Sequence, residues 1–595
     1  MYIKFIFDYS IFLNIFYFLV HNTIKVFLKG LFMNSEKFKT IFSNLFIYHE
    51  TKKYDFDLPE TQIDNPNEET SNSLGNVSKN IDNNLNTIKI VYNSLINSDI
   101  KIREFTLVAQ NIEYKAFLIY IDGMSDATLI NNFILKPLML RNPSNTYISN
   151  PPKSIPNNSH IKVRKIFNLE NYIYKSLLPQ NDIKKKADLK ELISDINSGN
   201  SVLFVDTLNI AFSLDVKGFK SRSISSPNNE VVVRGSQESF VEVIRTNTSI
   251  LRRLVNNENL IVENIEVGKI SKTKVAVCYL KNLANDTLVA EVKFRINNLD
   301  IDSLVSSGEL EQLIQDNGYS LPQLIATERP DKAVNHLYEG RVVIIVNGSP
   351  FVLVAPCVFV DLITSPEDLN LKYQYSNLLR IMRFIAAFFA LLLPAFYLSV
   401  SAYHQELIPT SLLFAIASSR ESVPFSIFFE IILMEVSFEL IREAGLRVPS
   451  PVGPTIGIVG ALILGEAAVS ADIVSPILII IIAITGICSF AIPDFSLSFS
   501  FRFLRFIFLI LAYVAGMLGI AVCSFICLCI LSNIKSFGVA YTAPYLPSSS
   551  KNTRTSFFVR PVWKREKRAP FLNPKSEDEE ANISMLWKKT INNRR

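Results

Sequence analysis

The sequence is poor in the side chains that carry most metal and redox chemistry. It contains five histidines and six cysteines in 595 residues, and their spacing indicates neither a metal-binding pair nor a disulfide framework. The short signatures GxxxxGK(S/T), GxSxG and HExxH are absent as well. We therefore predict that the protein is not an enzyme, and we assign it no catalytic, cofactor-binding or metal-binding residue.

A strong net charge is also missing. The formal charge is +5, without a basic stripe, which excludes a typical nucleic-acid partner. The sequence is instead apolar, with 49% hydrophobic residues, 43 phenylalanines and a mean hydropathy of +0.24. These values predict a membrane protein. Residues 384–534 contain more acidic than basic residues. The rest of the chain therefore carries a larger positive charge than the whole, which suits the anionic cytoplasmic face of a membrane.

The N-terminal part divides into an extension and a linker. Residues 1–48 are an apolar N-terminal extension, but Lys4, Asp8 and Asn14 make it a poor signal peptide and a poor spanning helix. Met33 opens a more ordinary polar start, so two alternatives remain. The extension either precedes the true start of the working protein or forms a membrane-surface helix. Residues 49–85 are rich in Asn, Ser and Glu, which predicts a disordered linker.

Residues 86–371 alternate between strand-like and helix-like patterns. This alternation predicts an α+β soluble N-terminal domain with two subdomains, residues 86–197 and 198–371, each built on a mixed sheet with covering helices. Within the second subdomain, Asn347-Gly348 lies between two β-branched runs. That pattern predicts a β-hairpin with a two-residue turn.

Residues 372–534 predict an all-α, multi-spanning membrane domain, followed by a cytoplasmic tail, residues 535–595. A helix is expected to start at Ser365-Pro366 and to run into the uncharged stretch 384–403. The other apolar blocks are residues 407–419, 423–441, 452–471, 473–492 and 506–531. The first of these is too short to span alone, so five or six spans remain possible. Either count leaves one basic segment on the outer side, and we prefer cytoplasmic ends.

Carboxylates inside the apolar blocks are candidate functional residues. Glu435 and Glu439 share one face of a helix, while Glu430 points to the opposite face from Glu439, and Glu466 lies in the next block. A lipid-facing carboxylate is unfavourable by several kcal/mol. These side chains therefore either pair with arginines such as Arg442 or form a polar lining for ions.

Small residues recur in the block that contains Glu466. Gly453, Gly457 and Ala461 are spaced four apart, with Gly460 beside them, so another helix can approach closely. The alternatives are tight packing and a flexible, gating helix.

Two charged segments lie in the second subdomain. One carries Arg234 and then a helix displaying Glu238, Arg252 and Arg253, and the other is the turn containing Glu328, Arg329 and Asp331. Such charges usually form a solvated face, whereas the alternative is a subunit interface.

Several stretches resemble one known family. They include YIDGMSDATLINNFILKPLM, VVVRGSQESFVEVIRTNTSILRRL, SFGVAYTAPY and the long run from residue 417 to 476. The resemblance covers about residues 101–570 and is to the GerA-type spore germination protein A family, the A subunits of nutrient germinant receptors. Residues 236–240 read Ser-Gln-Glu-Ser-Phe where the family more often has Pro-Arg-Glu-Gly-Phe, so this chain departs from the family's pattern in that segment.

The resemblance implies a multi-pass protein of the inner membrane of the spore, with its soluble domain in the cytoplasm. It implies a homo-oligomer that couples nutrient sensing to ion release. The expected partners are a transporter-like B subunit and a C-subunit lipoprotein. A scaffold that assembles the receptor without conducting ions is the alternative.

Overall fold

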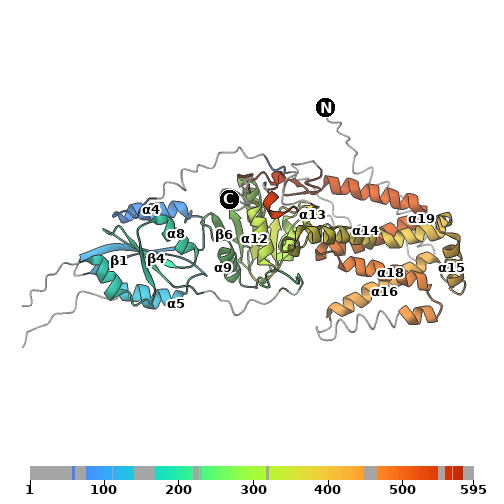
Figure 1. Cartoon of the computed structure of the whole chain (residues 1–595), viewed down its shortest axis with the longest axis horizontal. Helices are drawn as coiled ribbons and strands as arrows, with labels where there is room; N and C mark the ends of the chain where they lie inside the picture. Colours follow the sequence, from blue (N-terminus) through green and yellow to red (C-terminus); the bar gives the residue numbers. More distant parts are fainter. Residues whose placement is uncertain are drawn as a thin grey trace, which may run out of the picture. The chain divides into compact units, whose positions relative to one another are not determined.

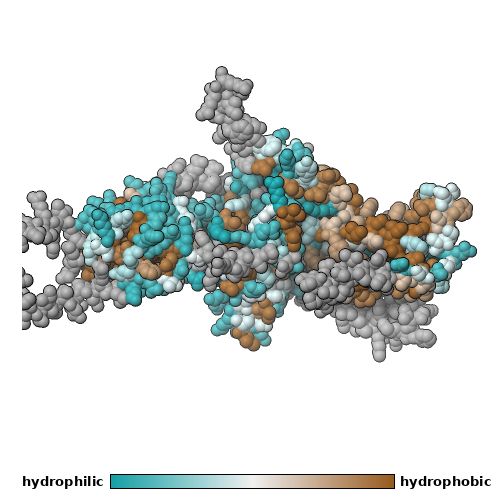
Figure 2. Space-filling view, turned by 60° about the horizontal axis from the view of Figure 1, so that its bottom comes forward, coloured by the Kyte–Doolittle hydropathy of each residue, from teal (hydrophilic) through white to brown (hydrophobic). Residues whose placement is uncertain are grey.

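The computed structural model divides the chain into two compact units (Figure 1). The α/β unit comprises Phe56–Asp316, Pro322–Arg380 and Ser532–Arg595, and the helical unit contains Ile381–Leu531. The structure describes residues 56–59, 75–109, 112–139, 168–218, 227, 229–316, 321–447, 465–546, 557–565 and 567–579. The predicted extension, residues 1–48, lies outside these ranges, as does most of the predicted linker. Figure 2 shows a mostly hydrophilic surface on the α/β unit and a largely hydrophobic one on the helical unit.

The first sheet has five strands in the order β1-β2-β4-β5-β3. They are β1 (Ile100–Ala109), β2 (Ile112–Ile121), β3 (Ile183–Lys186), β4 (Ser201–Val205) and β5 (Ala211–Leu214). Helices α4 (Ile81–Val91) and α8 (Leu189–Asn197) cover one face. The other face is covered by α5 (Ala127–Leu129), η1 (Ile130–Leu135), α6 (Lys136–Met139), α7 (Leu169–Tyr172) and η3 (Ile173–Leu177). Residues on β2 alternate between the two cores, as the period of a strand requires.

Two predicted boundaries need correction here. Strands β4 and β5 belong to the first sheet, so the division between subdomains comes after Leu214 and not after residue 197. Helix α4 begins at Ile81, inside the predicted linker, because Asn80 caps it and its apolar residues pack on the sheet.

The second sheet also has five strands, in the order β6-β7-β9-β10-β8. They are β6 (Leu260–Val267), β7 (Thr273–Leu280), β8 (Ile325–Thr327), β9 (Val342–Val346) and β10 (Val352–Ala355). Helices α10 (Asp286–Asn297) and α11 (Ser307–Ile314) cover one face, whereas α9 (Ile244–Leu254) and α12 (Pro330–Tyr338) contact the sheet and each other elsewhere. The predicted hairpin is confirmed as β9–β10, but its connection is longer than two residues.

Every strand pairing described in these two sheets is antiparallel, so the prediction of mixed sheets is wrong. After each helical connection, the chain enters a strand that runs antiparallel to the strand it pairs with. Alternation of helix and strand patterns cannot by itself distinguish this arrangement from a parallel crossover.

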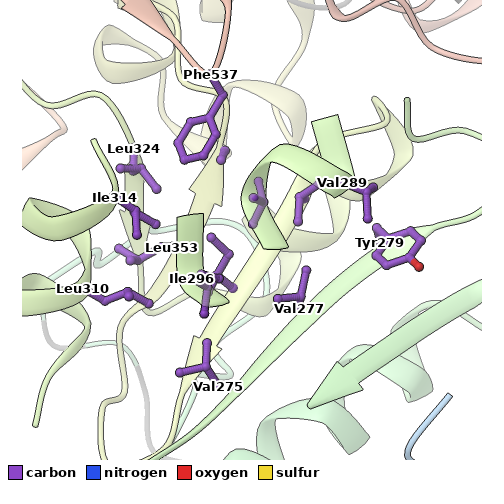
Figure 3. Close-up of a cluster of buried hydrophobic side chains, with 14 of the residues drawn as sticks. Val275, Val277, Tyr279, Val289, Ile296, Leu310, Ile314, Leu324, Leu353 and Phe537 are labelled. Carbon is purple, nitrogen blue, oxygen red and sulfur yellow. The ribbon is translucent and has the colours of Figure 1, made fainter. Parts of the chain in front are cut away.

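The segment after the last helix packs into the second sheet's core. Strands β11 (Lys535–Ser536) and β12 (Val539–Ala540) form a short hairpin, and Phe537 between them is fully buried among Leu324, Leu353 and their neighbours (Figure 3). The Arg295 guanidinium lies 4.2 Å from the centre of the Phe537 ring. Further along, Asn377 exchanges two hydrogen bonds with the backbone of Val559. The described part of the predicted tail is therefore built into the α/β unit.

Five helices dominate the membrane-like part of the chain: α14 (Tyr373–Tyr403), α15 (Thr410–Arg420), α16 (Ile427–Arg447), α18 (Pro476–Phe490) and α19 (Phe495–Asn533). Among the described helices, α14 and α19 are long and apolar enough to cross a membrane. The predicted start at Ser365 caps a separate turn, η4 (Pro366–Leu369), and α14 begins at Tyr373. Leu398, Ile431, Leu478 and Phe508 form part of the core between these helices.

Helix α19 consists of two arms that meet at Gly516. This glycine has φ 58° and ψ −136°, a conformation that side chains other than hydrogen rarely allow. A Cβ on Gly519 would collide with the carbonyl oxygen of Leu511, eight residues earlier. Those residues would lie about 12 Å apart in a straight helix, so the chain folds back between them. The prediction of one span over residues 506–531 is therefore wrong.

Candidate functional site

Helix α16 positions the three predicted intramembrane glutamates on two faces. Glu435 and Glu439 lie against the first arm of α19, and Glu430 faces α15 and the start of α18. The helical period predicted this separation. The structure adds the arginines that each carboxylate meets.

Glu430 is 1% exposed and holds the ends of two helices together. One carboxylate oxygen accepts a hydrogen bond from Arg420 at 3.1 Å, and the other accepts one from the backbone N–H of Ser475 at 3.2 Å. Ser475 is the N-cap of α18, so this carboxylate lies at the positive end of that helix.

The other two glutamates form a cluster with three arginines, and we call it the arginine–glutamate cluster. Its members are Glu435, Glu439, Arg442, Arg502 and Arg505. Arg505 donates to Glu435 at 2.5 Å, and Arg502 donates to Glu439 at 2.8 Å. Arg442 lies 3.7 Å from Glu439 and donates to the Ser489 hydroxyl at 2.6 Å. These contacts support the arginine-pairing alternative for the glutamates.

Arg502 and Arg505 fall between the predicted blocks 473–492 and 506–531, which places them outside the expected spans. They instead lie in the first arm of α19, largely buried. The available signal was their three-residue spacing, which puts both on one helical face opposite two glutamates spaced by four.

The remaining predicted membrane residues have different outcomes. Glu466 is exposed in the helical unit. The predicted packing or gating residues Gly453, Gly457, Gly460 and Ala461 lie outside the described residues, so their role stays a prediction.

In the α/β unit, Arg252 joins the two sheets. It is 2% exposed, and its Nε and Nη2 donate to the two carboxylate oxygens of Asp99 at 2.7 and 2.9 Å. Nη2 also donates to Asn97 at 2.9 Å. Asp99 and Asn97 directly precede β1, whereas Arg252 is on α9. The prediction of Arg252 as a solvated or intersubunit residue is therefore corrected, because the residue is buried and its Nε and Nη2 bind Asp99 and Asn97 within the chain.

The Glu328–Asp331 turn braces the loop that carries Arg234. Arg329 is fully buried and donates to the backbone carbonyls of Glu230 and Ser236 as well as to Asp331. Glu328 is also buried, and its side chain accepts hydrogen bonds from Asn229. These side chains hold the loop in place, so Glu328 and Arg329 do not have the exposure that the interface prediction required.

The other predicted interface residues are at least partly exposed to solvent. Arg234 is exposed at the tip of the braced loop, Glu238 pairs with Arg253, and all of Glu238, Arg253 and Asp331 are partly exposed. A subunit contact through these residues stays a prediction.

The side chain of Glu230 anchors this loop. Burial alone would raise the pKa of its carboxyl, but the Lys332 ammonium, the Thr327 hydroxyl and the Glu328 backbone N–H hold the pKa below the ordinary 4.5. Lys332 Nζ lies 2.7 Å from a Glu230 oxygen. Across the ranges that the structure describes, no group of three His, Cys, Asp or Glu side chains is arranged to hold a metal ion.

Comparisons with known proteins match most of the chain. The family model described as Bacillus/Clostridium GerA spore germination protein matches residues 86–571. Spore germination protein KA of Bacillus subtilis is 37% identical over 472 residues, covering 79% of this chain and 83% of the relative. Spore germination protein A1 of the same organism is 39% identical over 408 residues, covering 68% and 85%.

A solved structure is also similar. It is the N-terminal domain of the A subunit of the Bacillus megaterium spore germinant receptor GerK3, at 30% identity, covering 48% of this chain and 98% of that one with a TM-score of 0.35. The family match spans both the α/β and the helical units. The chain belongs to the Bacillus/Clostridium GerA spore germination protein family.

Proposed function

We propose that this protein is the A subunit of a spore nutrient germinant receptor, an oligomer that couples nutrient sensing to ion release. The observation that carries this proposal is the family match over residues 86–571, which includes all the helices described within Ile381–Leu531. The proposed partners are a transporter-like B subunit and a C-subunit lipoprotein. The proposed location is the inner membrane of the spore, with the α/β unit in the cytoplasm.

The packing of the C-terminal segment supports an even number of membrane passages. The chain leaves the α/β unit through α14, and after α19 it returns Phe537 to the core of that same unit. A folded domain cannot have its core on both sides of a bilayer. The five-span alternative is therefore disfavoured.

Six passages account for the basic residues as well. The proposed passages are α14, α16, the predicted apolar block 452–471, α18 and the two arms of α19, residues 495–515 and 517–533. Helix α15 then lies at the surface, with 11 residues being too few to cross. In this arrangement Arg442, Arg447, Arg502 and Arg505 lie at the cytoplasmic ends of their passages, in agreement with the positive-inside tendency.

The scaffold alternative also has a specific observation in its favour. Glu430, Glu435 and Glu439 each pair with an arginine, so each carboxylate is already neutralised. A carboxylate that binds a passing ion has to give up such a partner. Pairing of this kind instead stabilises the packing of α16 against its neighbours.

A genetic experiment tests the receptor assignment. Deleting the gene from its spore-forming host should abolish the response to the matching nutrient, while spores still respond to a stimulus that bypasses nutrient receptors. An unchanged response to every nutrient tested would contradict the assignment.

Reconstitution separates the channel from the scaffold. The purified protein in liposomes should pass monovalent ions if it forms the path, and Glu435→Gln should change that passage. Glu406→Gln is the matched control, because Glu406 is exposed and is not among the predicted ion-path carboxylates. Absence of ion passage with correctly assembled wild-type protein would favour the scaffold.

A further inference from the structure

In the arginine–glutamate cluster, Arg505 has two guanidinium nitrogens, Nε and Nη2, that make no hydrogen bond among the described residues. Arg505 is 1% exposed and contacts Glu435 through Nη1 alone. Its Nε and Nη2 are buried and have no hydrogen-bond partner among the described residues. These two nitrogens form the edge with which a guanidinium binds an anion through two parallel hydrogen bonds.

The charges of the cluster point the same way. Three arginines face two glutamates, so the five side chains carry a formal excess of one positive charge. The Nε atoms of Arg442 and Arg502 are likewise buried without a hydrogen-bond partner in the part of the chain that the structure describes, as are the Oε1 atoms of Glu435 and Glu439. Phenylalanine rings cover both guanidinium groups, at 4.6 Å for Phe490 and 5.0 Å for Phe499. A buried charge and buried donors without acceptors are both unfavourable.

The geometry points to a binding site for one small inorganic anion of halide size, held by Nε and Nη2 of Arg505 between α16 and the first arm of α19. One such anion supplies an acceptor at the Nε–Nη2 edge, which the contact of Arg505 with Glu435 does not use, and it cancels the excess charge of these five side chains. A water molecule would accept the hydrogen bonds but would leave the charge. Because the edge is fully buried, an organic anion or the side chain of another chain cannot reach it.

This site is independent of ion release, because the anion is a resident part of the folded helical unit. It is expected to stabilise the packing of α16 on α19. Binding to the folded state alone raises the midpoint of unfolding in proportion to the logarithm of the free anion concentration once the site begins to fill.

The test is an anion titration on the purified full-length protein in detergent. Potassium chloride or bromide replaces potassium gluconate at constant ionic strength, and the thermal midpoint is recorded. We expect a rise of about 3 °C with the halides and none with gluconate. Equal midpoints in chloride and gluconate would overturn the proposal and indicate water in the site.

Two variants make the test specific. Arg505→Lys keeps a positive charge beside Glu435 but removes the two-nitrogen edge, so the halide-dependent rise should disappear. Arg420→Lys is the matched control outside the cluster, and its rise should persist. Retention of the rise in Arg505→Lys would contradict the site. If Arg505→Lys does not fold, chloride NMR line broadening on the wild type, reversed by bromide but not gluconate, decides the question, and its absence overturns the proposal.

Discussion

Arg252 and Arg253 are neighbours in sequence with opposite surroundings. Arg252 is buried and holds Asp99 with two hydrogen bonds, whereas Arg253 is partly exposed and pairs with Glu238. The helical pattern placed both on a charged helix. It could not identify Asp99, 153 residues away, as the partner that takes Arg252 into the core.

Replacing Arg252 with alanine should therefore destabilise the α/β unit by about 3–5 kcal/mol, because it leaves Asp99 as an unpaired buried charge. Arg253→Ala is the adjacent control and should change stability by about 0–1 kcal/mol. Urea unfolding of the purified protein measures both. Equal losses of unfolding free energy in the two variants would show that the Arg252–Asp99 pair contributes no more than an ordinary surface ion pair.

Glu230 predicts a pH dependence. Its carboxyl has a lowered pKa in the folded protein, so its pairing with Lys332 stabilises the fold above the ordinary pKa of 4.5. That contribution should be lost as the pH falls through the lower folded-state value. The wild type should lose thermal stability more steeply than Glu230→Gln between neutral and acidic pH. Parallel pH profiles of the two proteins would contradict this assignment.

At the scale of elements, local patterns predicted helices and hairpins better than their connections. The period of Glu430, Glu435 and Glu439 correctly separated two faces of α16. Hydropathy could not locate the turn at Gly516, because residues on both sides of it are equally apolar. Strand direction was missed for a similar reason, since antiparallel and parallel sheets use the same residues.

Gly516 should tolerate no side chain. With φ 58° and ψ −136°, an alanine there is strained, and its Cβ would lie 3.3 Å from Tyr403 and His404. Gly516→Ala should cost about 1–3 kcal/mol and lower the thermal midpoint. Gly445→Ala is the control, because a Cβ at Gly445 meets nothing within 4 Å. A midpoint unchanged by Gly516→Ala would argue against the folded-back arms.

At the scale of the whole molecule, the sequence predicted the membrane class, the α/β and helical parts and the family. Its ambiguity over five or six spans came from the short block 407–419, and it also treated the two arms of α19 as one crossing. The resolving contacts join residues far apart in the chain, such as Asn377 and Val559, so no local pattern contains them.

Cysteine labelling tests the six-passage arrangement. Leu407 and Leu546 are both exposed, and they precede α15 and follow β12. In a cysteine-free background, Leu407→Cys should react with an impermeant reagent only from outside, and Leu546→Cys only after the membrane is opened. The six-passage arrangement places an odd number of passages between these two positions, so they should lie on opposite sides of the membrane. Reaction of both cysteines from the same side would contradict that arrangement.

The burial of Phe537 also sets an order of events during synthesis. The ribosome makes the strands around this ring first, and it then makes Ile381–Leu531 before Phe537 emerges. The core in Figure 3 is therefore closed by a residue that is synthesised only after the helices of Ile381–Leu531. A chain that stalls before Phe537 is made keeps an apolar gap in the core of its α/β unit. Chaperones and proteases can recognise that gap. Closure of the second sheet's core by Phe537 therefore shows that the helices of Ile381–Leu531 have been synthesised.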